Sequence, residues 1–269
     1  MSAKKSEYVK IDELKKVKAG KVFKWYKETR EKVTREQLQY IPYEYNGARR
    51  RMDLSIRFQL ENAKMKPTEK MAFLIFSIPA VMTCPGATAQ CMHFCYARRD
   101  ERFSTTRASR LSNFIITLRP DFCALLEKAI KETVYNKNGS IKKAFSGKKI
   151  IVRVHESGDF YNVEYMRSWF NVARRFPNFT FFAYTKSFTI LEKCIDEKPD
   201  NFTIRASIWS DTAKNDLYII EKNNLPFYKA LADIAGYSKK NICSCAGGCG
   251  GCGCKCSKAE LKEIVTKIH

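Results

Sequence analysis

Residues 149–160 read KIIVRVHESGDF. The first half is rich in Ile and Val, and it passes directly into polar residues, a glycine and an acidic residue. This change predicts a buried strand over 149–155 that ends in a polar loop. The following residues, 162–175, place apolar side chains such as Val163 and Phe170 at helical spacing. The stretch therefore predicts one strand–loop–helix unit.

The same alternation continues on both sides of this unit. The further predicted elements are a strand at 72–78, a helix that opens at Asp121, a strand at 180–185, a helix at 187–195, a strand at 202–208 and a helix from about Ala213. Strands that alternate with helices predict a parallel sheet of the α/β class. We expect a partial (β/α) barrel or an open parallel sheet of four or five strands, with ligands at the C-terminal ends of the strands.

Three predicted strands end in polar residues, which a parallel sheet would bring together. They are His155, Glu156, Ser157, Gly158 and Asp159, then Tyr184, Thr185 and Lys186, then Ser207, Ser210 and Asp211. We expect His155, Asp159 and Lys186 to be catalytic, with His155 as an acid–base group and Lys186 as the partner of a carboxylate or phosphate. Ser207 would hydrogen-bond a ribose or a carboxylate. The structural alternative is that Ser157 or Asp159 caps the next helix.

Three cysteines follow the strand predicted at 72–78, in the segment Cys84-Pro-Gly-Ala-Thr-Ala-Gln-Cys91-Met-His-Phe-Cys95. A loop at a strand end can aim several thiolates at one point. Three thiolates can hold a [4Fe–4S] cluster and leave one iron open for a ligand. Zinc is the alternative, with His93 as a fourth ligand. Three unrelated core cysteines are the plain alternative.

A second group of cysteines lies near the C-terminus, with six thiols between residues 243 and 256 and glycines among them. Four ligands suffice for a [4Fe–4S] cluster or for tetrahedral zinc. The preferred ligands are Cys245, Cys249, Cys252 and Cys256, with Cys243 and Cys254 as alternates. Cys123 and Cys194 fall on apolar helix faces and are interpreted as core residues.

The first cysteine segment resembles the cysteine loop of radical SAM enzymes, and the aromatic residues Phe94 and Tyr96 beside Cys95 are typical of it. Its cysteines are spaced further apart than is usual in that family. The resemblance implies that the open iron chelates S-adenosyl-L-methionine. Ser157, Gly158 and Asp159 would then correspond to the motif that receives the amino group of that cofactor. The full set of expected cofactor-binding residues is Ser157, Gly158, Asp159, Tyr184, Lys186 and Ser207.

A second resemblance covers most of the chain after residue 70. Its motifs are Ser77-Ile-Pro-Ala, Cys84-Pro-Gly-Ala-Thr, Cys95-Tyr-Ala, Arg107 with Arg110 and Asn113, His155-Glu-Ser-Gly-Asp-Phe, and Ala183-Tyr-Thr-Lys-Ser. They resemble a family of phage and plasmid proteins that is known only as a numbered phage gene product. The resemblance implies a phage or mobile-element setting. Arg107, Arg110 and Asn113 share one helix face, which is either solvated or a clamp for phosphate or substrate.

The chain is strongly basic, with 49 Lys and Arg against 28 Asp and Glu and a formal net charge of +21. This balance favours a phosphate-rich partner, most simply a nucleic acid or a nucleotide. No apolar stretch reaches the roughly 20 residues that span a bilayer, and no apolar segment follows the N-terminal lysines. We expect no membrane partner and a cytoplasmic location, in the host if the protein is phage-encoded. The sequence does not indicate an oligomeric state.

Three regions are expected along the chain. Residues 1–70 would form a basic N-terminal extension or cap, with a helix at 11–29. Residues 71–240 would form the α/β iron–sulfur core. Residues 241–269 would form the Cys-rich auxiliary metal site, whose Cys- and Gly-rich part is expected to be neither sheet nor helix.

Two functions fit these patterns. The first is a radical-SAM-like iron–sulfur enzyme that acts on a nucleic acid or a nucleotide. The second is a nucleic-acid-binding phage protein whose zinc or iron–sulfur sites are structural and which performs no radical chemistry.

Overall fold

The computed structural model describes residues 41–45, 48–52, 56–231, 242–244 and 248–267. The helix predicted at 11–29 lies outside these residues. In the N-terminal part, β1 (Ile41–Tyr45) pairs with β2 (Ala48–Met52) as an antiparallel hairpin.

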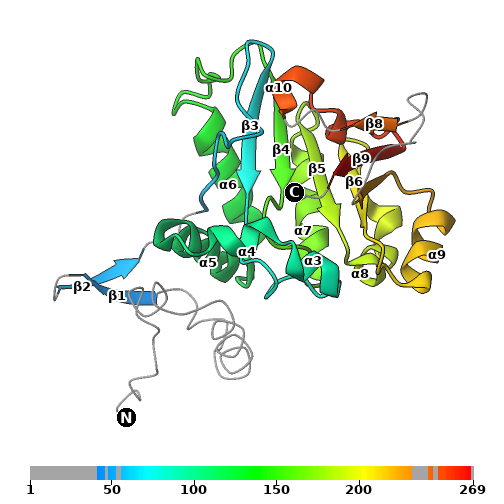
Figure 1. The fold of residues 1–269 in the computed structure, drawn as a ribbon. Helices are drawn as coiled ribbons and strands as arrows, with labels where there is room; N and C mark the ends of the chain where they lie inside the picture. Colours follow the sequence, from blue (N-terminus) through cyan, green and yellow to red (C-terminus); the bar gives the residue numbers. More distant parts are fainter. Residues whose placement is uncertain (1–40, 46–47, 53–55, 232–241, 245–247, 268–269) are drawn as a thin grey trace.

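In the described parts of the chain, seven strands form one sheet in the order β3-β4-β5-β6-β7-β9-β8, and every neighbouring pair is parallel. The strands are β3 (Met71–Phe76), β4 (Lys149–Val154), β5 (Thr180–Thr185), β6 (Phe202–Ile208), β7 (Phe227–Leu231), β8 (Ile242–Ser244) and β9 (Glu263–Lys267). The predicted α/β class with an open parallel sheet is therefore confirmed, although the sheet is larger than expected (Figure 1).

Strands β3 to β7 follow one another in chain order across the sheet, so each connection crosses in the same direction. Parallel crossovers are right-handed, which places their helices on one face of the sheet. These helices are α5 (Ser104–Thr117), α6 (Phe122–Val134), α7 (Val163–Arg175), α8 (Phe188–Glu192) and α9 (Lys214–Lys222). The predicted helices at 121 and 162–175 are confirmed, and Asn162 caps α7 by accepting a hydrogen bond from the Tyr165 backbone N–H at 2.7 Å.

The two faces of the sheet have different cores, because side chains alternate between faces along a strand. On β5, Phe181 and Ala183 pack among the helices, whereas Phe182 belongs to a second apolar cluster on the opposite face. That second cluster also contains Met65, Phe73, Ile75, Ile151, Ile264, Cys254 and Cys256. The second face is therefore covered in part by the C-terminal cysteine segment and by residues that precede β3.

Arg205 on β6 fixes the C-terminal segment to this second face. Its guanidinium is fully buried and donates to the backbone carbonyls of Cys256 at 2.8 Å, Leu261 at 2.7 Å and Lys258 at 2.5 Å. Thr203, also on β6, donates to the Ser257 carbonyl at 3.0 Å. One buried cation thus satisfies several carbonyls of a segment that has little regular structure of its own.

The C-terminal prediction needs a correction. The Cys- and Gly-rich part was expected to be neither sheet nor helix, but β8 and a short helix, α10 (Cys249–Cys252), lie within it, and β9 follows it. Strand β9 pairs with both β7 and β8, so the segment contributes two strands to the sheet. Residues before β3 also join the core, because Met65 is buried and Gln59 bridges Ile75.

Among the described residues, none of the helices combines the length and the apolar character that crossing a bilayer requires.

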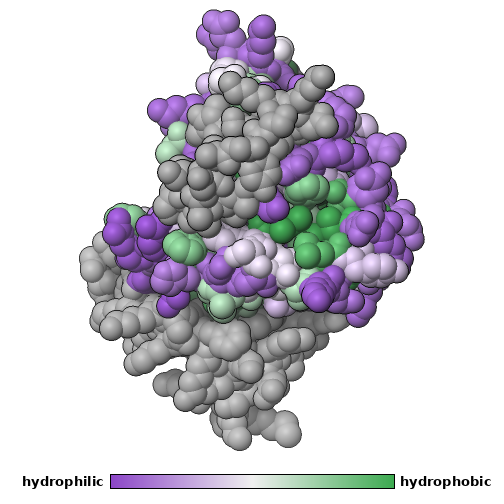
Figure 2. All heavy atoms as spheres, turned by 45° about the vertical axis from the view of Figure 1, so that its right-hand side comes forward, coloured by the Kyte–Doolittle hydropathy of each residue, from purple (hydrophilic) through white to green (hydrophobic). Residues whose placement is uncertain are grey.

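Cys194 is buried and Cys123 packs against the helix-side core, as predicted for both. The space-filling view shows a hydrophobic area set in a hollow with a largely hydrophilic rim (Figure 2).

The role of Arg205 can be tested with Arg205→Leu. This change leaves several buried carbonyls without a donor, and we expect the free energy of unfolding to fall by about 3 kcal/mol or more. Urea denaturation measures the loss. The control is Arg167→Leu, which removes a half-exposed ion pair with Glu197 and should cost less than about 1 kcal/mol. Equal losses of unfolding free energy in the two variants would contradict this role of Arg205.

Candidate functional site

The C-terminal ends of β4 and β5 are joined by the buried carboxylate of Asp159. It accepts hydrogen bonds from the Thr185 hydroxyl at 2.7 Å, from the Lys186 backbone N–H at 2.8 Å and from its neighbour Phe160 at 2.7 Å. Burial raises the pKa of Asp159, and these hydrogen bonds oppose that shift. The predicted convergence of polar strand ends is observed here.

Lys186 extends the site to β6. Its ammonium donates to the Ser207 hydroxyl at 2.5 Å and lies 5.6 Å from the centre of the Trp209 ring. Burial lowers the pKa of Lys186, while the nearby Cys91 and Asp159 act in the opposite direction. A buried ammonium whose contacts among the described residues include a hydroxyl and an aromatic ring is suited to a small anionic group.

The cysteine loop lies over these strand ends. It runs from Cys84 through α3 (Ala89–His93), which Thr88 caps, to Cys95, whose thiol accepts a hydrogen bond from the Arg98 backbone N–H at 3.4 Å as α4 (Tyr96–Asp100) begins. The three thiols are partly buried. They are also near one another: burial raises the pKa of Cys84, and the charges of Asp159, Cys91 and Cys95 raise it further.

Two glycines allow the loop to approach the strand ends. A side chain at Gly86 would place its Cβ 2.0 Å from the carbonyl oxygen of Lys186. Gly158 has a positive φ of 86°, and a Cβ there would lie 2.3 Å from Cγ1 of Ile78. Gly158 was predicted to give a close backbone approach, and what approaches it in the structure is the segment that leads into the cysteine loop.

The end of β6 contacts the same loop. Asp211 accepts a hydrogen bond from the Gln90 backbone N–H at 2.8 Å, and Ser210 donates to the Gln90 side-chain oxygen at 2.7 Å. Phe94 stacks on Trp209, with ring centres 5.9 Å apart and planes 13° from parallel. All three predicted strand ends therefore meet around the cysteine loop.

His155 is placed elsewhere. Its Nε2 lies 2.8 Å from the hydroxyl of Tyr165 on α7, and its ring packs against Phe160 in the helix-side core. Burial, with the charge of Arg153, lowers its pKa to about 3. These contacts give no support to the catalytic role predicted for His155. Ser157 is also buried, and no partner of its hydroxyl is found among the described residues.

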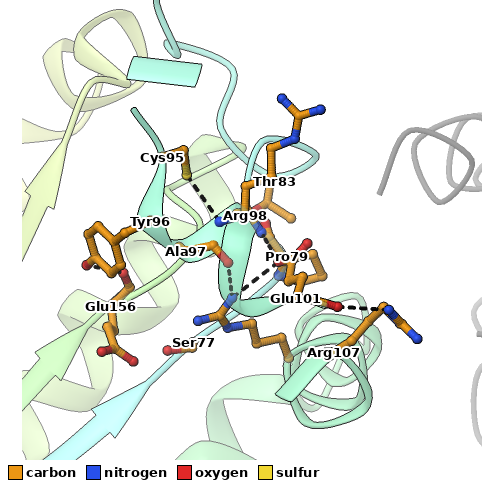
Figure 3. Close-up of polar contacts among 12 residues, drawn as sticks. Ser77, Pro79, Thr83, Cys95, Tyr96, Ala97, Arg98, Glu101, Arg107 and Glu156 are labelled. Atoms are coloured by element: carbon orange, nitrogen blue, oxygen red, sulfur yellow. Dashed lines mark hydrogen bonds and ion pairs between the residues drawn. The ribbon is translucent and has the colours of Figure 1, made fainter. Parts of the chain in front are cut away.

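Arg107, Arg110 and Asn113 hold the backbone of the loop region and are neither a solvated face nor a free clamp. Arg110 donates to the Ala97 carbonyl at 2.7 Å and pairs with buried Glu101, which accepts from the Ala80 N–H at 2.6 Å. Arg107 donates to the Glu101 carbonyl at 2.8 Å (Figure 3). The Asn113 side chain donates to the carbonyls of Arg57 and Ser77, both at 3.0 Å.

Three of the C-terminal cysteines, Cys249, Cys254 and Cys256, lie on the second face. Cys254 is fully buried, its N–H donates to the Cys249 carbonyl at 3.0 Å, and the Cys249 N–H donates to the Lys64 carbonyl at 2.7 Å. A hydrogen bond from the Cys254 side chain lowers the pKa of the Cys249 thiol. Cys245, one of the preferred ligands, lies outside the described residues, and the side chain of Cys243 is likewise not described.

A line of contacts leads from one cysteine region to the other. Tyr96, next to Cys95, donates to the Glu156 carbonyl at 2.9 Å, and its hydroxyl also accepts from Arg153 at 3.3 Å. The Arg153 guanidinium lies 5.7 Å from the centre of the Tyr184 ring. Burial raises the pKa of Tyr184, and the adjacent Cys256 raises it further. Tyr184, predicted to bind a cofactor, therefore lies between the two cysteine regions.

In the part of the chain that the structure describes, no three His, Cys, Asp or Glu side chains come together as a group that could hold a metal ion. The thiols of the cysteine loop are close, yet they do not form a closed ligand set.

Comparison with known proteins identifies the family. The model of the Gene product 88 family matches residues 54–234, more than half of the chain. The chain belongs to the Gene product 88 family. It is 31% identical over 126 residues to the Gene 88 protein of Mycobacterium phage L5, covering 45% of this chain and 50% of that protein. It is 33% identical over 108 residues to the Gene 88 protein of Mycobacterium phage D29, covering 39% of this chain and 42% of that protein.

The chain thus spans about half the length of these relatives, or less, and their names state no activity. No solved structure matches the chain. The predicted resemblance to a numbered phage gene-product family is confirmed. The matched Gene product 88 region contains the first cysteine loop and ends before the C-terminal cysteines.

Several residues of this Gene product 88 site were not expected from the sequence. Gln90 and Trp209 join the loop to β6, and Arg153 joins Tyr96 to Tyr184. Arg153 could have been found from its strand position, because an arginine inside the apolar run 149–154 must face a polar partner. Gln90 and Trp209 depend on contacts across more than 100 positions of the chain and carry no local signal.

The close approach at Gly158 generates a prediction with a matched control. Gly158 and exposed Gly139 both have positive φ, at 86° and 81°, but nothing lies within 4 Å of a Cβ at Gly139. The backbone strain of an alanine is therefore similar at both sites. We expect Gly158→Ala to cost about 1–3 kcal/mol more than Gly139→Ala in chemical denaturation, because Ile78 and Thr83 must move. Equal losses of unfolding free energy in the two variants would show that Ile78 and Thr83 do not pack closely against Gly158.

Proposed function

We propose that the chain is an iron–sulfur protein with radical-SAM-like chemistry, and that Cys84, Cys91 and Cys95 hold its cluster. The observation that carries the proposal is the position of these three cysteines. They lie on one loop that follows β3, and the loop contacts the C-terminal ends of β4, β5 and β6. Ligands of parallel α/β folds bind at this edge of the sheet.

The chemistry of the ligand atoms supports iron–sulfur binding. Thiolates are the usual ligands of iron–sulfur clusters, and three of them leave one iron available to a further ligand. The three thiols are partly buried and influence one another electrostatically. Because the described side chains do not form a closed ligand set, the loop must adjust its thiols when a cluster is assembled. A cluster with an open iron would supply one-electron reduction of bound S-adenosyl-L-methionine.

The chain's own residues would then bind and orient the cofactor. The Lys186 ammonium, which Ser207 and Trp209 hold in place, is suited to its carboxylate. Asp159 is fully engaged with backbone and hydroxyl donors, so we assign it a positioning role: it sets the place of Lys186. Gly86 and Gly158 let the loop lie against this group. The C-terminal cysteines would hold a second cluster, or zinc.

A second candidate is a nucleic-acid-binding protein whose zinc or iron–sulfur sites are structural. The long spacing between Cys84 and Cys91 favours it, as does the net charge of +21. For either candidate, two observations support a place in the cytoplasm of the host cell. The relatives are phage proteins, and many free thiols need reducing conditions.

Metal analysis distinguishes the two candidates. We expect the anaerobically purified protein to contain about eight irons with matching sulfide if two [4Fe–4S] clusters are present, or about four if zinc fills the C-terminal site. Cys91→Ala should lose about four irons, because it removes one ligand of the first cluster. Cys123→Ala is the control and should lose none, since Cys123 packs against the helix-side core. A colourless protein that contains zinc alone would remove the iron–sulfur proposal.

The radical chemistry is tested through Lys186. We expect the reduced protein to release 5′-deoxyadenosine from S-adenosyl-L-methionine, and Lys186→Met to lower the rate at least about tenfold by removing a charged hydrogen-bond donor. Lys193→Met, an exposed lysine just after α8, should leave the rate unchanged within about twofold. Product formation and iron content are measured on the same samples. An iron-loaded protein that releases no 5′-deoxyadenosine would favour the second candidate.

A further inference from the structure

The surface beside the cysteine loop is unusually rich in exposed aromatic side chains. Phe94 is 41% exposed, Tyr96 44% and Phe103 52%. Three exposed arginines, Arg98, Arg99 and Arg102, lie in the same short stretch of chain. We call these six residues the aromatic–arginine surface. Large apolar side chains are costly to leave in water, so such a concentration indicates a binding surface.

We propose that the aromatic–arginine surface binds single-stranded nucleic acid and leads one of its bases toward the cysteine loop. The inference deepens the proposed function by naming its substrate class. It rests on the proposed function for the reaction alone, because the binding depends on exposed side chains that need no cluster.

The ring of Phe94 links the aromatic–arginine surface to the residues around Lys186. Its ring stacks nearly parallel on Trp209, and Trp209 lies 5.6 Å from the Lys186 ammonium. Because much of the Phe94 side chain remains exposed, a base can extend this stack from the outside. Every base offers a flat π-face, so stacking of this kind tolerates any sequence. The stack would therefore connect the outer surface with the strand-end group around Lys186.

The aromatic–arginine surface also carries positive charge that can bind phosphate groups. Two acidic residues lie in this stretch. Glu101 is buried and paired with Arg110, and Asp100 is partly exposed, so the three exposed arginines outnumber the one carboxylate that can neutralise them. Arg102 already lies over the Phe103 ring, 4.7 Å from its centre, which is an arrangement that can sandwich a base. Arginines between stacking aromatics bind the phosphates that join successive bases. The net charge of +21 adds long-range attraction.

Single strands fit this surface better than duplexes. In a duplex the bases are stacked on one another, and their faces are not available to Phe94 or Phe103. Tyr96 differs from these two, because its hydroxyl is already bound to the Glu156 carbonyl. We therefore assign base stacking to Phe94 and Phe103, and phosphate binding to Arg98, Arg99 and Arg102.

The test is fluorescence anisotropy with labelled oligonucleotides of about 15 nucleotides, the upper range of site sizes for such surfaces. The full-length protein is titrated with single-stranded DNA, single-stranded RNA, duplex DNA and a DNA strand of abasic sites. We expect one or both single strands to bind at least about tenfold more tightly than the abasic strand, since each stacked base contributes that much. The tighter of DNA and RNA identifies the substrate.

Variants assign the effect to the surface. Phe103→Ala and Phe94→Ala should each weaken single-strand binding at least about tenfold, whereas Tyr218→Ala, which removes an aromatic residue of α9 that is 60% exposed, should change it less than twofold. The triple variant Arg98→Gln, Arg99→Gln and Arg102→Gln should reduce the salt dependence of binding. The charge-matched control, Lys128→Gln, Lys131→Gln and Lys143→Gln at exposed lysines, should reduce it less.

The outcomes separate this inference from the proposed function, because iron content is measured for every sample. Single-strand binding that depends on Phe103 in a protein without iron would support the surface and remove the cluster. Equal binding of intact and abasic strands would overturn the inference, because charge alone then explains the affinity. Binding to anionic lipid vesicles but not to oligonucleotides would overturn it as well, and would identify the surface as a membrane contact.

Discussion

The C-terminal edge of the sheet depends on the hydrogen bonds of the buried Asp159 carboxylate. The carboxylate collects two backbone N–H groups and one hydroxyl, and in doing so it fixes the end of β4 against the end of β5. The position of Lys186 follows from that junction, and the cysteine loop is seated on it through Gly86. A carboxylate that is this deeply buried is stable only when its hydrogen bonds are made, so the edge is held in one arrangement.

The opposite face of the sheet is organised in a different way. Helices α5 to α9 cover one face through apolar packing, but the other is covered in part by the C-terminal cysteine segment, several of whose carbonyls need donors. Arg205 supplies those donors from inside the sheet. Cys256 is thus held by protein contacts at a position near Tyr184.

The sequence predicted the parts of the fold in which local pattern and tertiary environment agree. Strands β4, β5 and β6 and helices α6 and α7 carry strong periodicity, and the polar residues after the strands marked the edge where they converge. The pattern failed at β7, β8 and β9, which are short and gain their stability from pairing with distant strands. It failed for Arg110 as well: helical spacing suggested a solvated face or a free clamp, but Glu101 binds this side chain inside the protein. Only a structure shows which polar residues are satisfied internally.

Arg153 has a consequence for how the two cysteine regions behave together. Its half-buried guanidinium lies between the Tyr96 hydroxyl, beside Cys95, and the Tyr184 ring, beside Cys256. One positive charge therefore serves both regions. Negative charge that accumulates at one of them draws on the same cation that would stabilise negative charge at the other. Lys186 also acts on Cys91 and Lys64 on Cys249, but Arg153 is a cation that lies near both regions, so a change in the charge of one region alters the electrostatic environment of the other without any movement of the backbone.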